Sequence, residues 1–439
     1  MRIDRKQRKL DELIRELKDK EFKYAPREER EINWSRYDEA QLNEINDMLL
    51  MIRDTVGEAA IRLHIKGAKF EGPGRPPYPP EDLAKAILMQ QYFSVANRGA
   101  AGLVLLFKEK MGIKHAFSYK TIERAYDDPL VTLILNEVFK MTQEPVKELE
   151  KDFSADGAGL PTSMKQNWER DKDDEDKQAG YEKMVAMVGT TYGLVSAVEF
   201  PDNPMAHDPP FFDPLLQETS GSYSSIELVC LDEAFLSRDD CDLIEKVGAV
   251  PRISLKRGIT LKRKGSWAWA EMLLDFIEDP QQWLHDYHLR SISETVFSVY
   301  KRDFCTPLRK RILQRRKKEA FSRVCDYNMK RLCYLRYLRA CRALEKHLAF
   351  CPKAPFAWFI AYPIYERKTL RVWAASECRA SNFWLEFLAQ QATWRCETSA
   401  SCFSGSSTLP RRDPARGNME GGSRARMTPC RFPRTAPPS

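Results

Sequence analysis

Apolar residues recur every three or four positions in the first part of the chain, as at Leu10, Ile14 and Leu17. This period predicts amphipathic helices over residues 1–68. The charges between the apolar positions are mixed in sign, so a solvated face over a small core is favoured there over a nucleic-acid contact. The proline-rich stretch 72–80 then predicts an extended linker, because proline fixes φ and has no N–H to donate.

Pro80, with acidic residues in the turn after it, predicts the start of a helix that reaches about Tyr92. Two shorter helices are predicted near 99–111 and 118–126. Three short helices with a polar, lysine-bearing start to the third are typical of a helix-turn-helix module. Many small helical bundles share this pattern, so DNA contact and plain packing both stay open for this region.

From about residue 148 the period changes to short apolar runs bounded by glycine, proline and polar residues, which predicts strands. The predicted strands are 151–156, 184–188, 194–200, 226–232 and 250–255, the first ending at Gly157. Helices are predicted at about 209–216, 237–247, 267–277 and 285–302. This order predicts the α/β class: a ribonuclease-H-like core, with a mixed sheet flanked by helices, preceded by an all-α domain.

Charge is distributed unevenly along the chain. The 439 residues have a formal net charge of +7, which permits a nucleic-acid partner without requiring one. Residues 301–340 carry 14 Lys or Arg against 3 Asp or Glu, and a run this one-sided favours phosphate binding over a merely solvated face. A second basic segment, 256–264, follows the last predicted strand.

The 11 cysteines and 6 histidines contain no zinc motif, since no Cys-x2-Cys pair occurs. Cys325, Cys333 and Cys341 stand eight residues apart, a spacing that suits buried thiols in a helix better than metal ligands. The charged N-terminus is unlike a secretory signal, and no apolar run is long enough to span a membrane. We therefore expect a cytoplasmic protein with reduced thiols and no membrane partner.

Three acidic residues stand where the predicted elements could bring them together. Asp156 closes the first strand, Asp232 closes the fourth, and Glu294 lies in the last helix. Two divalent ions about 4 Å apart, bound by carboxylate oxygens, stabilise both the attacking and the leaving oxygen of a phosphodiester displacement. Each residue alone is well explained by a cap or a salt bridge, but together on this strand order they favour a metal-dependent site.

The last predicted helix carries a second pattern around Glu294. Arg290 stands four residues before it and Lys301 seven after it, roughly on one helical face, with Tyr287 one turn before Arg290. This face would present a metal ligand beside a guanidinium fork and a point charge, both of which bind phosphate. A plain salt bridge would explain Arg290 and Glu294 but neither Tyr287 nor Lys301.

These four residues fit Tyr-x2-Arg-x3-Glu-x6-Lys, which resembles the motif around the catalytic glutamate in DDE transposases of bacterial and archaeal insertion sequences. Asp232-Glu-Ala-Phe is similar to the family's second-aspartate motif, and Asp156-Gly-Ala-Gly-Leu to its first. The segment Arg75-Pro-Pro-Tyr-Pro-Pro-Glu-Asp-Leu resembles the helical domain before that core. The resemblance covers about residues 70–350.

The resemblance implies an enzyme that binds element ends and catalyses metal-dependent DNA strand cleavage and strand transfer. The implied catalytic residues, which are also the ligands of two Mg²⁺ or Mn²⁺ ions, are Asp156, Asp232 and Glu294. The residues implied to hold the end phosphates are Tyr287, Arg290 and Lys301. The implied partners are double-stranded DNA, as transposon ends and as target, and a second copy in a homodimer on DNA, in a prokaryotic cytoplasm at the nucleoid.

Residues outside the motifs are weaker candidates. Lys262, Arg263 and Lys264 are expected to contact the DNA backbone, with simple solubility as the alternative. Trp267 could stack on a base extruded at the cleaved end, although packing in the core is the favoured alternative. Asp208, placed at the end of the third strand, either assists the site or caps the helix that follows.

The sequence predicts four segments. They are a helical N-terminal segment (1–70), a helical, helix-turn-helix-like DNA-binding domain (71–147), a DDE catalytic domain (148–350) and an atypical tail (351–439). Residues 352–439 contain 11 Arg but only 2 Lys, together with four of the nine Trp, which is unusual for a disordered tail. We hypothesise that the tail is read in a shifted frame, or else lacks stable structure.

Two other functions are compatible with the same pattern. One is a plain ribonuclease-H-like nuclease, which the helical domain and the basic run argue against. The other is a catalytically inactive DNA-binding remnant of a transposase, which a frame-shifted tail would favour. Loss of DNA nicking on Asp232→Ala separates both enzymes from the remnant, and strand transfer separates transposase from nuclease.

Overall fold

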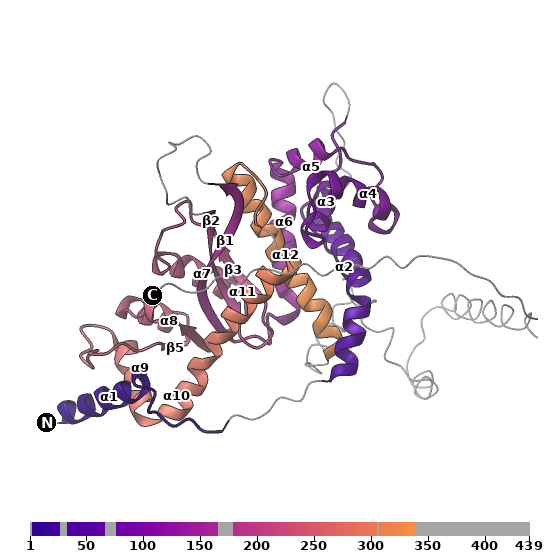
Figure 1. Cartoon of the computed structure of the whole chain (residues 1–439). Coiled ribbons are helices and arrows are strands. Elements are labelled where there is room, and N and C mark those ends of the chain that lie inside the picture. The colour runs from indigo at the N-terminus through magenta and orange to yellow at the C-terminus, as the bar shows by residue number, and fades with distance from the viewer. Residues whose placement is uncertain (1, 27–32, 66–75, 166–178, 305–306, 339–439) are drawn as a thin grey trace, which may run out of the picture. The chain divides into compact units, whose positions relative to one another are not determined.

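A computed structural model describes residues 2–26, 33–65, 76–165, 179–304 and 307–338 (Figure 1). The predicted tail 351–439 and the first part of the proline-rich stretch, residues 72–75, lie outside the described residues. The hypothesis of a shifted reading frame therefore stays a hypothesis. The division of the rest of the chain at residues 70 and 147 also stays a prediction.

The chain before residue 147 is helical, as the apolar period predicts up to about residue 126, but the following helix over 129–143 was not predicted. Its helices are α1 (Arg2–Lys18), α2 (Trp34–Arg62), α3 (Pro80–Tyr92), α4 (Asn97–Met111), α5 (Tyr119–Ala125), α6 (Pro129–Gln143) and the 3-10 turn η1 (Glu144–Val146). Side chains of Asn33, Ser118 and Asp128 accept hydrogen bonds from first-turn N–H groups and so fix where α2, α5 and α6 begin. Pro80 opens α3, where a missing N–H is tolerated.

Five strands form one mixed sheet. They are β1 (Asp152–Lys165), β2 (Ala179–Gly189), β3 (Val195–Glu199), β4 (Leu228–Leu231) and β5 (Val250–Ile253), in the order β3-β2-β1-β4-β5. β1, β2 and β3 are antiparallel neighbours, whereas β4 runs parallel to β1 and β5 parallel to β4. The carboxyl ends of β1, β4 and β5 therefore point the same way, which is the arrangement that a site at strand ends needs.

Helices cover the sheet and complete a ribonuclease-H-like α/β fold, as predicted (Figure 1). They are η2 (Pro209–Phe211), α7 (Phe212–Ser222), η3 (Glu233–Phe235), α8 (Arg238–Lys246), α9 (Trp267–Glu278), α10 (Pro280–Tyr287), η4 (His288–Arg290), α11 (Ser291–Asp303) and α12 (Leu313–Leu338). α7 packs on β2 and β3, α11 on β1 and β2, and α9 on β5. These contacts bury apolar side chains such as Phe153, Leu231 and Phe276 completely.

β1 does not end at Gly157, contrary to the prediction. Its pairing with β2 continues without a shift from Phe153 to Pro161. Glycine is required at position 157 because a Cβ atom there would lie 2.6 Å from an oxygen of the Asp208 carboxylate. Inside a strand, glycine can thus mark a close approach of another group and not a stop.

The predicted single helix over 285–302 is also wrong. α10 ends at Tyr287, the 3-10 turn η4 follows, and α11 begins at Ser291. The hydroxyl groups of Ser291 and Ser293 donate to the carbonyls of His288 and Arg290. Such local bonds compete with the regular helical ladder, which explains the tightened turn at this point.

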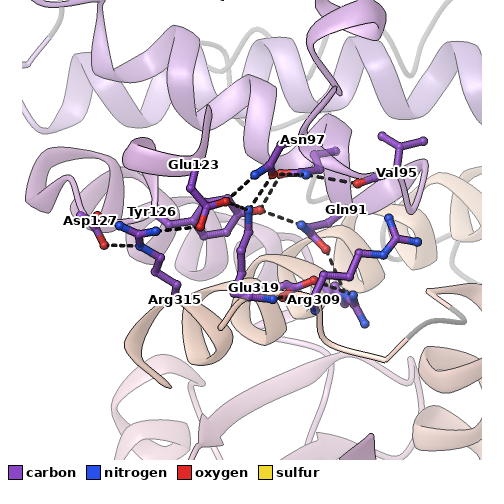
Figure 2. A network of polar contacts seen from close by, with 12 residues as sticks. Gln91, Val95, Asn97, Glu123, Tyr126, Asp127, Arg309, Arg315 and Glu319 are labelled. Carbon is purple, nitrogen blue, oxygen red and sulfur yellow. Dashed lines mark hydrogen bonds and ion pairs between the residues drawn. The ribbon is translucent and has the colours of Figure 1, made fainter. Parts of the chain in front are cut away.

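Most of the basic run 301–340 forms α12, which packs against α2, α3 and α6 as well as the sheet domain. Its intramolecular ion pairs include Lys310–Glu123, Arg315–Asp127, Arg316–Glu182, Lys317–Asp202, Arg323–Glu319 and Lys330–Asp303. These six side chains are engaged inside the protein, so the phosphate-binding interpretation is not carried forward for them. Figure 2 shows how part of this set forms one polar network with helices α3 and α5.

Buried thiols and helix composition agree with two simpler predictions. Cys325 and Cys333 are buried free thiols in α12, as their spacing predicts, while Cys341 lies outside the described residues. None of the helices in the described part of the chain combines the length and apolar character that a membrane crossing requires.

Candidate active site

Asp156 and Asp232 follow a pair of neighbouring residues on two parallel strands. Ala155 of β1 is paired with Leu231 of β4, so each aspartate is the next residue of its strand. The side chain of Leu231 is fully buried, which anchors the point where Asp232 leaves the sheet. The structure thus brings together two of the three predicted carboxylates, which are 76 positions apart in the sequence.

Glu294 approaches from the helix that covers this part of the sheet. The hydroxyl of Ser154 in β1 donates to that of Ser293 in α11 at 3.4 Å, and both side chains are buried. Alternate residues of a strand share a face, so Asp156 lies on the same face of β1 as Ser154. Glu294 follows Ser293 in the first turn of α11, and 55% of its side chain is exposed.

Arg290 links two of the carboxylates. One guanidinium nitrogen lies 3.7 Å from Oδ2 of Asp156, and another donates to Oε1 of Glu294. The salt bridge considered as the alternative for Arg290 and Glu294 is therefore present, but it extends to Asp156. Burial lowers the pKa of Arg290, and the neighbouring Tyr287, Glu294 and Asp232 raise it to a net value above the ordinary one.

The three acidic groups influence one another electrostatically. Burial is the main reason that the pKa of Asp156 is raised above its ordinary value. The N–H of Gly157, which donates to Oδ1, and the charge of Arg290 oppose that shift, whereas Asp232 and Glu294 reinforce it. Negative charge is therefore crowded at this edge of the sheet, and a cation placed there would relieve it.

The donor set fits a hard divalent cation in kind, since it consists of carboxylate oxygens from three separate elements. In the described part of the chain, however, no group of three Asp, Glu, His or Cys side chains is gathered closely enough to hold a metal ion. The guanidinium of Arg290 supplies the positive charge between Asp156 and Glu294 instead. The three carboxylates thus suit a divalent cation in chemistry but are not gathered around one point, and Arg290 is the counter-charge of Asp156 and Glu294.

The two remaining residues of the predicted helical pattern occupy different environments. Tyr287 is half-buried and stacks on Trp283, with ring centroids 5.6 Å apart. It lies close enough to Arg290 to affect the pKa of that residue. Lys301 is exposed in the last turn of α11, two helical turns beyond Glu294, so the 3-10 turn separates it from the Tyr287 end of the pattern.

Comparison with known proteins shows what the chain resembles. Residues 149–329, which contain the three carboxylates, match the family model described as a transposase DDE domain. A probable transposase for the insertion sequence element ISA1214 of Archaeoglobus fulgidus is 25% identical over 316 residues, which are 71% of this chain and 90% of that protein. The chain is therefore similar to DDE transposases of insertion sequences over these residues.

A solved structure was also matched, the Mos1 transposase paired-end complex with left transposon end. It is 12% identical, and the match covers 55% of this chain and 86% of the Mos1 chain. The TM-score is 0.17, so no inference about fold or function is drawn from it.

The basic segment 256–264 of the protein is a largely exposed loop after β5. Lys262, Arg263 and Lys264 are all exposed, and none of the three has a carboxylate partner among the described ion pairs. Trp267 at the start of α9 is 61% exposed, with the guanidinium of Arg263 stacked 3.6 Å from its ring centre. The alternative that Trp267 packs in the core is therefore wrong, and Trp269 takes that place.

Asp208 does not join the carboxylate cluster. β3 ends at Glu199, so Asp208 lies in the segment after it and not at its end as expected. Its carboxylate pairs with Lys183 of β2 and sits against Gly157, whose missing Cβ would point to the face of β1 opposite Asp156. It does not cap η2 either, because it makes no side-chain capping bond there.

Two features of the site were not found from sequence. The buried Ser154–Ser293 contact fixes α11 on β1, but a serine pair far apart in sequence gives no local signal. Lys18 of α1 forms an ion pair with Glu233, the residue after Asp232. The mixed charges of the first helix were interpreted as a solvated face, and only tertiary contacts reveal this partner.

Proposed function

We propose that the protein binds the ends of an insertion sequence and catalyses metal-dependent strand cleavage followed by strand transfer into target DNA. The observation that carries this proposal is the neighbouring position of Asp156 and Asp232 on parallel strands, with Glu294 joined to Asp156 through Arg290. The relative's description as a probable transposase supports the same activity.

Asp156, Asp232 and Glu294 would hold the divalent cations, Mg²⁺ or Mn²⁺, and two ions are proposed. Such cations activate the attacking oxygen and stabilise the leaving oxygen of the phosphodiester. Asp156 lies within β1 and Asp232 directly follows the buried end of β4, which limits how far the two carboxylates can shift. Glu294 is the most exposed of the three and the one whose partner would have to change, since it now accepts from Arg290.

Positive groups around the carboxylates would bind the phosphates of the DNA end. Arg290 can offer a planar fork of donors to a phosphate, and Tyr287 beside it offers a hydroxyl. Lys301, Lys262, Arg263 and Lys264 would contact the backbone farther along, and the exposed face of Trp267 would stack on a base. A homodimer that brings two element ends together is proposed as the working form.

The proposal is tested with an isosteric pair of variants at adjacent positions. Asp232→Asn removes a proposed metal ligand, whereas Glu233→Gln alters the next carboxylate, which pairs with Lys18. Purified protein is given duplex DNA carrying the element's own terminal sequence and Mg²⁺, and strand nicking and joining to a second duplex are followed on gels. We expect wild type and Glu233→Gln to nick and join, and Asp232→Asn to bind the DNA without nicking it.

The possible outcomes separate the three functions. Nicking without joining would support the nuclease in place of the transposase. DNA binding without nicking by the wild type would support the inactive remnant. Equal nicking by wild type and Asp232→Asn would contradict the carboxylate site itself.

A further inference from the structure

The basic loop, residues 256–264, is held in one conformation by side chains from three different helices. The amide of Gln7 in α1 donates to the carbonyl of Ile259 at 2.8 Å and accepts from the N–H of Leu261 at 2.9 Å. The indole of Trp269 in α9 donates to the carbonyl of Thr260 at 2.9 Å. The guanidinium of Arg238 in α8 donates to the carbonyls of residues 262 and 263 at 2.9 and 3.1 Å.

These bonds occupy the loop's backbone and leave the charges of Lys262, Arg263 and Lys264 without a carboxylate partner among the described ion pairs, whereas Arg257 pairs with Asp19. The carbonyls of residues 259, 260, 262 and 263 all accept from protein side chains. Lys264 adopts φ 47°, in the left-handed region that costs a lysine about 1 kcal/mol, and such a residue persists only where its surroundings impose it. The loop is therefore a preformed surface and not a flexible chain.

The position of the loop relates it to the carboxylate site. β5 is parallel to β4, and the N–H of Ser254 after β5 donates to the carbonyl of Leu231, directly before Asp232. The loop thus leaves the sheet at the edge where Asp232 lies. The helix α1 borders the same edge, because its last residue, Lys18, pairs with Glu233.

Helix α1 is itself firmly attached to the catalytic domain. Leu10 and Ile14, on the helical face that packs against α9, are buried to 0% and 2% exposure. Gln7 lies one turn before Leu10 on that face and is held over the loop. The apolar contacts therefore place Gln7, and Gln7 in turn places the loop.

We propose that Gln7 is a positioning residue for DNA binding, and that α1 serves the transposase by holding the basic loop in the shape that presents Lys262, Arg263 and Lys264 to the DNA backbone. This inference rests on the proposed function, since it names a residue that acts through the same DNA-binding surface. Gln7 itself touches no phosphate. It removes conformational freedom from the loop before binding, so less entropy is lost when the loop meets DNA.

The test compares Gln7→Ala with Gln281→Ala in the full chain. Gln281 of α10 makes the same kind of two-way amide contact with a backbone, donating to the carbonyl of Lys23 and accepting from the N–H of Ala25. It therefore controls for the loss of one amide–backbone pair that does not hold the loop. Binding to a short fluorescent DNA duplex of arbitrary sequence is measured without divalent metal, over a series of salt concentrations.

We expect Gln7→Ala to bind about tenfold more weakly at low salt, which corresponds to about 1.4 kcal/mol. The slope of log affinity against log salt should also become shallower by about 1 to 2, because each lost phosphate contact contributes about 0.9. Gln281→Ala should show the wild-type affinity and slope. Gln7→Glu, which keeps the acceptor for Leu261 but loses the donor to Ile259, should fall between wild type and Gln7→Ala.

Limited trypsin digestion provides a readout that needs no DNA. The loop contains several trypsin sites, and we expect Gln7→Ala to be cut within residues 256–264 faster than wild type and Gln281→Ala. Equal cutting would overturn the positioning role. Faster cutting with unchanged affinity and slope would overturn the link to DNA, while nicking dependent on Asp232 could still hold. Failure of the wild type to bind any duplex would overturn the proposed function, and with it the DNA role of the loop.

Discussion

Two clusters in this protein are built from the same side chains, carboxylates beside arginine or lysine, and differ in how completely their charges are matched. In the polar network of Figure 2, Glu123 accepts from Lys310, Arg315 and Asn97. In the carboxylate site, Asp156 and Glu294 share the guanidinium of Arg290, and Asp232 adds a third negative charge near it. The first cluster is saturated, and the second lacks positive charge.

The pKa values show this difference directly. Burial acts to raise the pKa of Glu123, but bonds from Lys310, Asn97 and Arg315 outweigh it and the net pKa is lowered. At Asp156 the opposing bonds do not suffice, and burial together with Asp232 and Glu294 raises the pKa. A saturated cluster stabilises the fold, whereas an unsaturated one costs stability and keeps an affinity for a cation. The comparison therefore separates a network that ties Lys310 and Arg315 to α5 from the candidate site proposed for chemistry.

The largest effect is expected for Asp156→Asn. Cleavage of end DNA should fall below detection, because a proposed metal ligand is lost. The variant should nevertheless melt at a higher temperature than wild type at neutral pH. The raised pKa means that the fold disfavours the charged form of Asp156. The stability that the protonated carboxyl contributes to the wild-type protein is therefore lost as the pH rises through the pKa in the folded state. Calorimetry of both proteins at pH 4 and pH 8 tests this. A melting temperature of Asp156→Asn below that of wild type at pH 8 would contradict the view that the cluster lacks positive charge.

Lys310→Met should have the next largest effect, on stability. The Lys310 side chain is only 4% exposed, and its removal takes the charged donor from Oε2 of Glu123 and one of two donors from Oδ1 of Asn97. Breaking such a buried pair costs about 3 kcal/mol. Lys317→Met is the matched control, since its partner Asp202 is 80% exposed and such surface pairs are worth about 0–1 kcal/mol. Urea unfolding of both variants measures the difference.

Arg290→Lys tests whether the guanidinium of Arg290 must reach two carboxylates at once. A lysine keeps the charge but loses the planar set of donors that reaches both Asp156 and Glu294. We expect cleavage to slow by about tenfold, near 1.4 kcal/mol, with little change in folding. Single-turnover nicking rates would show it, and a rate equal to that of wild type would mean that charge alone suffices.

The smallest effect is expected at a carboxylate with no basic partner. Glu150 is fully buried and accepts from the N–H groups of Thr191 and Tyr192, and burial raises its pKa to about 7. Its contribution to stability is therefore present below its unfolded pKa and lost as the pH rises through about 7. Glu150→Gln does not titrate. The melting-temperature gap between wild type and variant should change by roughly 2–4 °C from pH 5 to pH 8.

Much of the fold was predictable because local signals carried it. The apolar periods located the helices before residue 126 and all five strands, whereas α6 was not predicted. Asp156 and Asp232 do lie at neighbouring positions, although Asp156 lies inside β1 and not at its end. The predicted limits failed where a tertiary contact decided them. Gly157 is explained by the Asp208 carboxylate, and the break before α11 by the hydroxyl bonds of Ser291 and Ser293.

The partners of charged residues were the least predictable part. The surplus of lysine and arginine in 301–340 indicated phosphate binding, yet Lys310 finds Glu123 from 187 positions away. In the same way, nothing in the first helix indicates that Gln7 meets a backbone 252 positions later. Composition shows that charge is in surplus, but only the folded chain shows which charges are left over.

The narrow space beside Gly157 has a consequence for how copies of this gene decay. An alanine at position 157, next to Asp156, would force a displacement. Either the Asp208 carboxylate, which pairs with Lys183, or the backbone of β1 would have to move. A single methyl group could thus silence the enzyme while every acidic residue of the motif is still encoded. The presence of all three acidic residues in an encoded sequence is therefore not sufficient to identify an active copy.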